Sequence, residues 1–323
     1  MTVRQVVALC GGIGGAKLAL GFYRALPPGG LTVVVNTGDD FEHLGLAISP
    51  DLDTVIYTLA GLDNPETGWG RRDETWTFMH VLESLGGASW FRLGDGDLAL
   101  HVERTRRLNQ GETLSSITAD IATRWGVTAE IFPMSDKPVR TLIQSEDETL
   151  GFQEYFVARR CAPPATGISF QGLDGASVST GALQAIASPR TGAVVICPSN
   201  PYLSVDPLLA VPGLKSAIAT AQAPVIAVTP IIGGRAVKGP TAKIMAELGL
   251  PVSPATIAHH YGGLIDGFVL DQTDTELKDE IALPVCLTNT LMHTLDDRVA
   301  LARVVCAFAL QLDSGRHRRR TAR

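Results

Sequence analysis

Short apolar runs rich in β-branched residues recur along the chain. Such runs are typical of strands buried on both faces of a parallel sheet. We expect strands at 5–10, 31–36, 192–197, 224–229, 267–271 and 284–288. Stretches with the spacing of apolar positions that marks helices lie between the later runs, at about 207–221, 240–248, 254–261 and 294–312. This alternation predicts an α/β protein with a doubly wound, mainly parallel sheet.

The middle of the chain has a different pattern. From Asp63 to about Pro164 the alternation fades, and helical patterns occupy 74–86 and 113–125. We therefore expect an inserted, mostly helical subdomain at 63–164. The sheet core would then be formed by 1–62 and 165–323.

Composition is that of an ordinary globular protein. Of the 323 residues, 45% are hydrophobic and 19% are charged, which excludes collagen-like and disordered classes. The five cysteines form no C-x-x-C pair, so a zinc ribbon is not supported, and they fit a reducing compartment. The sequence has no recognisable signal peptide and no apolar stretch of ~18 residues. We expect a cytoplasmic protein without a membrane segment.

The formal net charge of −6 argues against nucleic-acid binding. Arginine is concentrated at the end of the chain, where 316–323 reads RHRRRTAR. We expect 314–323 to form a disordered, Arg-rich tail.

Four glycines and a lysine follow the first predicted strand: Gly11, Gly12, Gly14, Gly15 and Lys17. Glycine lets backbone N–H groups approach an anion at the start of a helix. The spacing is not that of a P-loop, and Lys17 occupies the third glycine position of G-x-G-x-x-G. A mononucleotide or phosphate site is therefore favoured over a dinucleotide site. The alternative is a tight strand-to-helix turn without a ligand.

Carboxylates are dense after the second predicted strand. The stretch 36–53 contains no Lys or Arg, and its acidic residues are Asp39, Asp40, Glu42, Asp51 and Asp53. Unpaired carboxylates at this density repel one another unless a cation lies among them, and oxygen ligands of this kind suit Mg²⁺ held jointly with substrate phosphates. We expect Asp39, Asp40 and Asp51 to bind the metal. For Asp51, capping of the following helix is an equal alternative.

Three further loops place polar residues where ligands bind in sheets of this class. Arg92 precedes the turn-like stretch Gly94–Asp97, and Ser199, Asn200 and Pro201 follow the strand at 192–197. The loop 228–239 contains Arg235 and Lys238. Each loop alone is an ordinary Gly/Pro connection, but together they predict one ligand-binding edge.

The ordered motifs of the chain resemble the 2-phospho-L-lactate transferase family of coenzyme F-420 biosynthesis. The resemblance spans about 4–310 and is carried by GGIGGAK, VVVNTGDD, ISPDLDTVIYTLAG, GWGxRxET, LGDGDLALH, FPMSDKPVRT, FQEYF, PSNPYLSVDPLLAVPG and TPIIGGRAVKGP. The combination of SPDLDT with LGDxD is its most specific part.

This resemblance implies a Rossmann-like core, dependence on Mg²⁺ and a homodimer. The family transfers a phospho-organic-acid group from a guanosine diphosphate-linked donor to the ribityl hydroxyl of 7,8-didemethyl-8-hydroxy-5-deazariboflavin (Fo), and GMP leaves. By motif, Asp53 and Arg92 match the family's Fo-binding positions. The loop Gly11–Lys17 and the turn Ser199–Pro201 match its nucleotide side. We expect Asp53 and Asp40 to be catalytic, with Asp53 orienting or deprotonating the hydroxyl.

Two alternatives differ in class from this transferase. The same superfamily contains non-enzymatic regulators that bind nucleotide sugars, but these would not need DLDT together with the LGDxD loop. A nucleotide-binding oxidoreductase is disfavoured by the missing third glycine. The donor acid could be phospholactyl, phosphoenolpyruvyl or phosphoglyceryl, and the motif order leans slightly towards phosphoenolpyruvyl.

Overall fold

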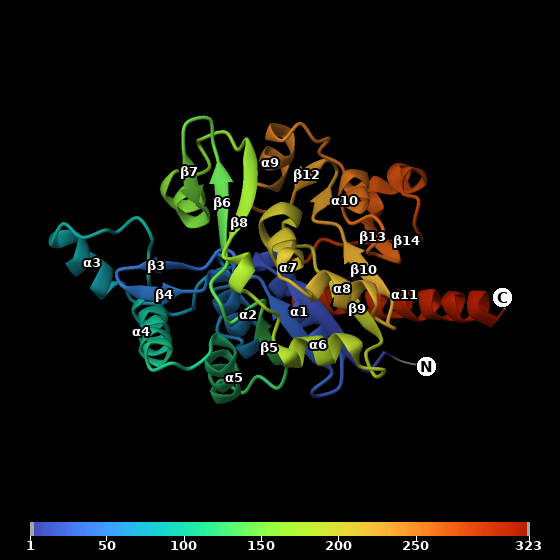
Figure 1. Cartoon of the computed structure of the whole chain (residues 1–323), viewed down its shortest axis with the longest axis horizontal. Helices are drawn as coiled ribbons and strands as arrows, with labels where there is room; N and C mark the ends of the chain where they lie inside the picture. Colours follow the sequence, from blue (N-terminus) through green and yellow to red (C-terminus); the bar gives the residue numbers. More distant parts are fainter. Residues whose placement is uncertain (1–2, 322–323) are drawn as a thin grey trace.

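A seven-stranded sheet forms the centre of the molecule (Figure 1). The computed structural model describes residues 3–321, with side chains through Asp313. All neighbouring strands of the central sheet run parallel. In spatial order they are β14 (Val285–Thr288), β13 (Gly267–Asp271), β10 (Val225–Val228), β9 (Ala193–Ile196), β1 (Val6–Cys10), β2 (Leu31–Val35) and β5 (Glu130–Pro133). The predicted α/β class with a Rossmann-like parallel sheet is confirmed.

Helices cover both faces of this sheet because its strand residues alternate between two apolar cores. In β1, Val7 and Leu9 belong to one core, whereas Val6, Ala8 and Cys10 belong to the other. The second core is closed by α1 (Gly12–Ala25), α2 (Pro50–Ala60), α5 (Leu114–Arg124) and α11 (Leu295–Thr321). The first is closed by α6 (Thr180–Ala187), α7 (Asp206–Ala210), α8 (Leu214–Ala219), α9 (Thr241–Glu247) and α10 (Pro254–His260).

Smaller elements surround the carboxyl edge of the sheet. The hairpin β3 (Phe41–His43) and β4 (Leu46–Ile48) lies beside α3 (Thr77–Ser84) and α4 (Asp95–Asn109) at one end of the molecule (Figure 1). A three-stranded antiparallel sheet is formed by β6 (Arg140–Gln144), β7 (Thr149–Gly151) and β8 (Gly167–Gln171). The remaining elements are β11 (Ile231–Ile232), β12 (Arg235–Ala236), the π-helical turns Glu154–Ala158 and Pro201–Val205, and the 3₁₀ segments Leu173–Gly175 and Gln272–Glu280.

The segment 63–164 contains more than helices. Its strand β5 pairs with β2 and forms one edge of the central sheet, so the sheet takes a strand from the region expected to form a separate subdomain. The expected helix at 207–221 is divided into α7 and α8 at the sequence Val211-Pro212-Gly213, where Gly213 has a φ of +94°. The Arg-rich tail expected at 314–323 lies outside the residues whose side chains are described. No helix within residues 3–321 is long and apolar enough to cross a membrane.

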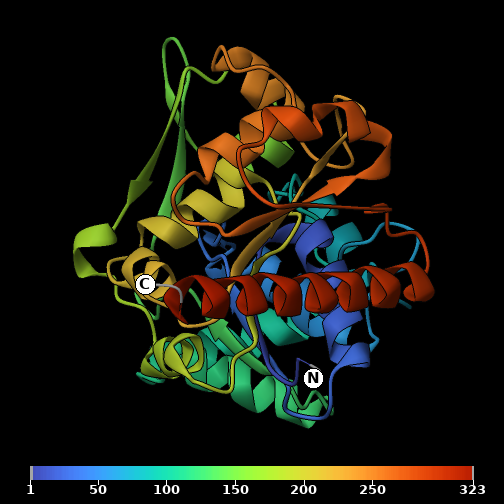
Figure 2. The same ribbon diagram turned by 90° about the vertical axis from the view of Figure 1, so that its right-hand side faces the viewer.

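Helix α11 crosses one face of the molecule and packs closely against α1 (Figure 2). The close approach occurs at Gly21 of α1, where an added Cβ would overlap the carbonyl oxygen of Arg298 on α11. The Cβ is bonded directly to the backbone of α1, and the carbonyl oxygen belongs to the backbone of α11. A side-chain rotation therefore cannot relieve the overlap. Gly21 therefore sets the separation of the two helices.

We predict that Gly21→Ala destabilises the protein. Alanine favours a helix over glycine by up to about 1 kcal/mol, but overpacking at this contact costs about 1–3 kcal/mol, so the net change is a loss. Thermal unfolding measures it. Gly151→Ala is the matched control because no atom lies within 4 Å of a Cβ at Gly151. A melting temperature of Gly21→Ala equal to or above the wild-type value would contradict the close contact.

Candidate active site at the carboxyl edge of the sheet

The order of the strands reverses direction between β1 and β9. Open parallel sheets bind ligands outside the carboxyl ends of their strands at such a point. The glycine loop follows β1, and Ser199 follows β9. The N–H of Gly11 donates a hydrogen bond of 3.0 Å to Oγ of Ser199. Two of the loops predicted from the sequence are therefore in direct contact.

Three of the four loop glycines are required by this contact and its surroundings. An added Cβ would overlap Ser204 at Gly11, the carbonyl oxygen of Pro198 at Gly14, and Oγ of Ser199 at Gly15. Gly12 is different, because its φ is +61° and the only atom near its Cβ position is Oδ1 of Asp51, at 3.7 Å. Gly12 thus opens towards the acidic residues, and close packing explains the other three glycines.

Asn200 and Pro201 form the start of a π-helical turn. Oδ1 of Asn200 accepts hydrogen bonds from the N–H groups of Tyr202 and Leu203, at 3.0 and 3.1 Å. Its Nδ2 is buried and has no partner among the described residues. The amide of Asn200 therefore caps the turn with one atom and keeps one donor free.

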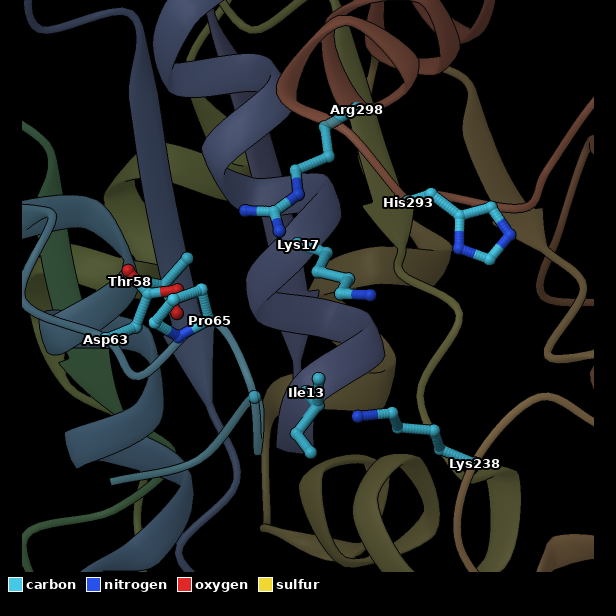
Figure 3. Close-up of a pocket in the computed structure, with 9 residues that line it drawn as sticks. Ile13, Lys17, Thr58, Asp63, Pro65, Lys238, His293 and Arg298 are labelled. Carbon is cyan, nitrogen blue, oxygen red and sulfur yellow. The ribbon is translucent and has the colours of Figure 1, made fainter. Parts of the chain in front are cut away.

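Lys17 points away from the glycine loop. Its Nζ donates to the carbonyl oxygen of Met292 at 2.9 Å and lines a small cavity beside α1 (Figure 3). Burial lowers the pKa of Lys17, and the nearby charges of Arg298 and Lys238 lower it further. The structure places Lys17 near other cations, in the second turn of α1.

Asp39 and Asp51 converge on a single amide group. Nδ2 of Asn36 donates to Oδ1 of Asp39 at 3.0 Å and to Oδ2 of Asp51 at 2.9 Å. Both carboxylates are buried. Burial raises the pKa of Asp39 well above its usual range, with a further contribution from Asp51. Burial also raises the pKa of Asp51 to about 6. The fold thus brings two carboxylates that are twelve residues apart in the sequence to the same amide group.

Asp40 is also buried, and only one of its two carboxylate oxygens has a hydrogen-bond partner among the described residues. Its Oδ2 accepts a hydrogen bond of 2.7 Å from Oγ of Ser49, whereas its Oδ1 is buried without a partner among the described residues. Burial raises the pKa of Asp40 to about 7, although Arg140 lowers it in part. An orphaned carboxylate oxygen of this kind is costly unless a ligand meets it.

Asp53 has a complete set of partners. The buried guanidinium of Arg104 binds both of its oxygens. His101 lies between Asp53 and Asp97, with its Nδ1 3.7 Å from Asp53 and its Nε2 3.3 Å from Asp97. The hydroxyl of Tyr57 donates to Asp97 at 2.6 Å. The structure therefore holds Asp53 rigidly within a charged network.

The ligand atoms of Asp53, Asp97 and His101 lie within 4.8 Å of one another, as in a metal site. Arg104 already supplies the positive charge to Asp53, so a cation would have to compete with it. The pair Asp39 and Asp51, which has no such partner, is the better candidate for a metal.

Arg92 lies in a second cavity of about 40 Å³ with aromatic walls. Its Cζ is 4.3 Å from the centroid of the Trp76 ring, which is a cation–π contact. Asp97 and Trp69 also line this cavity, so it reaches the Asp53 network through Asp97. Arg92 and Asp53 are thus connected, but Asp53 lies behind the wall of the cavity.

The sequence analysis missed Arg104 and the hydrogen bond between Tyr57 and Asp97. The stretch Gly94–Asp97 was expected to be a turn, but α4 begins at Asp95. Asp97, His101 and Arg104 follow each other at helical spacing and therefore share one face of α4. This spacing could have identified the helix from the sequence. Gly94 and Gly96 instead favoured the prediction of a turn.

Comparison with known proteins gives the same assignment over most of the chain. A profile of the family described as 2-phospho-L-lactate transferase CofD matches residues 6–303. The phosphoenolpyruvate transferase of Streptomyces griseus subsp. griseus is 40% identical, covering 94% of this chain and 98% of that protein. The phosphoenolpyruvate transferase of Kitasatospora aureofaciens is also 40% identical, covering 96% and 99%.

A solved structure supports the fold. A member of the UPF0052 family from Bacillus halodurans matches with a TM-score of 0.60 at 16% identity, covering 93% of this chain and 98% of that one. The resemblance noted in the motifs is confirmed, and the chain belongs to the 2-phospho-L-lactate transferase CofD family.

Proposed function

We propose that this protein transfers a phospho-organic-acid group from a guanosine diphosphate-linked donor to the ribityl hydroxyl of Fo, releasing GMP, as a step of coenzyme F-420 biosynthesis. Membership of a transferase family supports the reaction class. The observation that carries the proposal is the set of buried carboxylates between the glycine loop and the aromatic cavity. The names of the relatives favour a phosphoenolpyruvyl donor over the phospholactyl and phosphoglyceryl alternatives.

The aromatic walls of the second cavity offer a surface on which the deazaflavin ring would stack, because a cavity of about 40 Å³ does not enclose a ring system of this size. Trp69 and Trp76 offer flat apolar surfaces, and Arg92 adds a cation that can hydrogen-bond a heterocycle. The ribityl chain would then extend past Asp97 towards Asp53 and Asp40. The guanosine diphosphate part would lie along Gly11–Gly15 and Ser199–Pro201, where the N-terminus of α1 favours negative charge.

The acidic residues fit a magnesium ion. Asp39 and Asp51 offer carboxylate oxygens that share one amide donor, and Asp40, the neighbour of Asp39 in the chain, has an orphaned Oδ1. Among the described residues, these three carboxylates do not all lie within 4.8 Å of one another. Such oxygen donors are the ligands that Mg²⁺ prefers when it is shared with phosphates. Asp39 and Asp51 would hold the ion, with Asp40 beside them, and bound Mg²⁺ would neutralise charge on the diphosphate.

The roles of Asp40 and Asp53 follow from their partners. The hydroxyl oxygen of Fo forms a bond to the phosphorus that carries the acid, and the bond from that phosphorus to the GMP oxygen breaks with its electron pair. The hydroxyl proton goes to Asp40, whose Oδ1 is free. Asp53 cannot readily accept this proton because Arg104 occupies both of its oxygens. It orients the acceptor through the network of His101 and Asp97.

The alternative of a nucleotide-sugar-binding regulator receives no support from the Bacillus halodurans structure, because a likeness at 16% identity shows the fold alone. The homodimer implied by the family resemblance stays a prediction.

We predict that Asp40→Asn lowers kcat by about 10²–10⁴-fold, the usual contribution of a general base. The asparagine keeps an acceptor for Ser49, so the fold is retained. GMP release from donor and Fo measures the rate. Asp147→Asn, an exposed carboxylate change, is the matched control. A kcat for Asp40→Asn within fivefold of wild type would assign the proton to another group.

We predict that Arg104→Met lowers the free energy of unfolding by about 3–5 kcal/mol near pH 8, because it leaves a buried carboxylate unpaired. The loss caused by Arg104→Met should be smaller in an Asp53→Asn background, since that change removes the unpaired charge. Chemical denaturation in both backgrounds tests this. Arg106→Met, on the exposed side of α4, is the control. Equal losses in both backgrounds would contradict a charge role for Arg104.

We predict that the metal-free protein becomes less stable as the pH rises from about 4 to about 7. The raised pKa values of Asp39, Asp40 and Asp51 mean that the folded state keeps protons that the unfolded chain has released. Millimolar MgCl₂ should raise the melting temperature near pH 8 and have less effect near pH 5. The double variant Asp39→Asn, Asp51→Asn should lose the MgCl₂ effect. A persistent MgCl₂ shift in that variant would place the ion elsewhere.

A further inference from the structure

A small cavity of about 70 Å³ beside α1 collects positive charge (Figure 3). Lys17, Lys238, Arg298 and His293 line it from α1, the loop after β12, α11 and the loop before α11. Asp63 is the one carboxylate among its lining residues. Helix α11 can bring Arg298 here because Gly21 allows its close approach to α1.

The cations of this cavity have no anionic partner among the residues whose side chains are described. Nζ of Lys17 donates to the carbonyl oxygen of Met292 at 2.9 Å, and Nζ of Lys238 donates to that of Thr67 at 3.3 Å. Nε of Arg298 is buried, and no described residue forms a hydrogen bond with it. Gathering three cations in this way is unfavourable by itself, so the cavity has the character of an anion site.

The position of the cavity connects it with both proposed substrates. The loop 63–71 forms a wall that it shares with the aromatic cavity: Asp63, Pro65 and Gly68 line the cationic side, whereas Asn64, Thr67, Trp69, Gly70 and Arg71 line the aromatic side. Ile13, directly after Gly12, lines the cationic side as well. Lys17 is five residues beyond Gly12, or ~7 Å along the helix axis. An anion bound here would lie beside the glycine loop and across a single loop from the acceptor.

We propose that this cationic pocket binds the carboxylate of the organic acid carried by the donor. The proposal rests on the proposed function and adds the site that recognises the acid. The diphosphate has its own proposed place at the carboxylates and the glycine loop. The acid carboxylate is the remaining anion of the donor and lies three bonds from the phosphorus under attack. Arginine and lysine together are well suited to it, because a guanidinium can bind a carboxylate through two hydrogen bonds.

The test compares two ligands that differ only in the carboxylate: the guanosine diphosphate ester of lactate and the ethyl ester of guanosine diphosphate. Calorimetry gives Kd for both with wild-type protein, Lys238→Met, Arg298→Met and the control Arg24→Met, which removes an exposed charge at the end of α1. We expect wild type and Arg24→Met to bind the lactate ester at least about tenfold more tightly. In Lys238→Met and Arg298→Met this ratio should fall towards one, while Kd for the ethyl ester changes less than about twofold.

Three results would overturn the proposal: a ratio near one in wild type, a wild-type ratio kept by both pocket variants, or equal weakening of both ligands, which would assign the pocket to a nucleotide phosphate. Lys238 is exposed, so its variant reports on the pocket even if Arg298→Met fails to fold. The proposed function is tested separately by product formation from Fo with the lactate, enolpyruvate and glycerate donors. Wild-type protein that forms no product with any of the three donors would contradict that function, whereas the Kd ratio would still show whether the pocket binds the carboxylate.

Discussion

The burial of four aspartates at one edge of the sheet is the constraint on which the site depends. Asp39, Asp40, Asp51 and Asp53 are all at most 7% exposed, yet only Asp53 has a buried cation bound to it. The other three rely on hydrogen bonds from Asn36, Ser49 and the backbone of Gly12, which offset only part of the cost of burial. A protein keeps such an arrangement where function requires it and obtains its stability elsewhere. Here the two apolar cores on the faces of the parallel sheet supply that stability.

The fold reduces this cost by the placement of its helices. Asp51 and Asp53 lie in the first turn of α2, where the positive end of the helix dipole favours carboxylates. Helix α4 lies across this region and brings Arg104 to Asp53 from 51 residues away. That contact makes α4 part of the site, because the helix that fixes Asp53 also carries Asp97 towards the aromatic cavity. One element thus couples the charged network to the proposed acceptor pocket.

The sequence predicts correctly those elements whose pattern of apolar residues matches their burial in the folded protein. Strands such as 5–10 and 31–36 are apolar throughout because both faces of the sheet are covered, so composition alone identified them. The loops after them were located for the same reason. The strand β5 was missed because Glu130–Pro133 is short, contains a charged residue and ends in proline at an edge of the sheet. The pairing of Asp53 with Arg104 depends on tertiary contact, which no spacing within either helix encodes.

Positive and negative charge are gathered separately on the two sides of the first turn of α1. Gly12 faces Asp51, whereas Ile13 and Lys17 line the cationic pocket. Each cluster alone lowers stability, because like charges are brought together with few opposite charges beside them. The proposed donor, which carries a diphosphate and a carboxylate a few bonds apart, would relieve both clusters at once, the first through a shared cation and the second directly. The net charge of −6 therefore says little about the ligand, because recognition depends on where these charges are placed on either side of one helix turn.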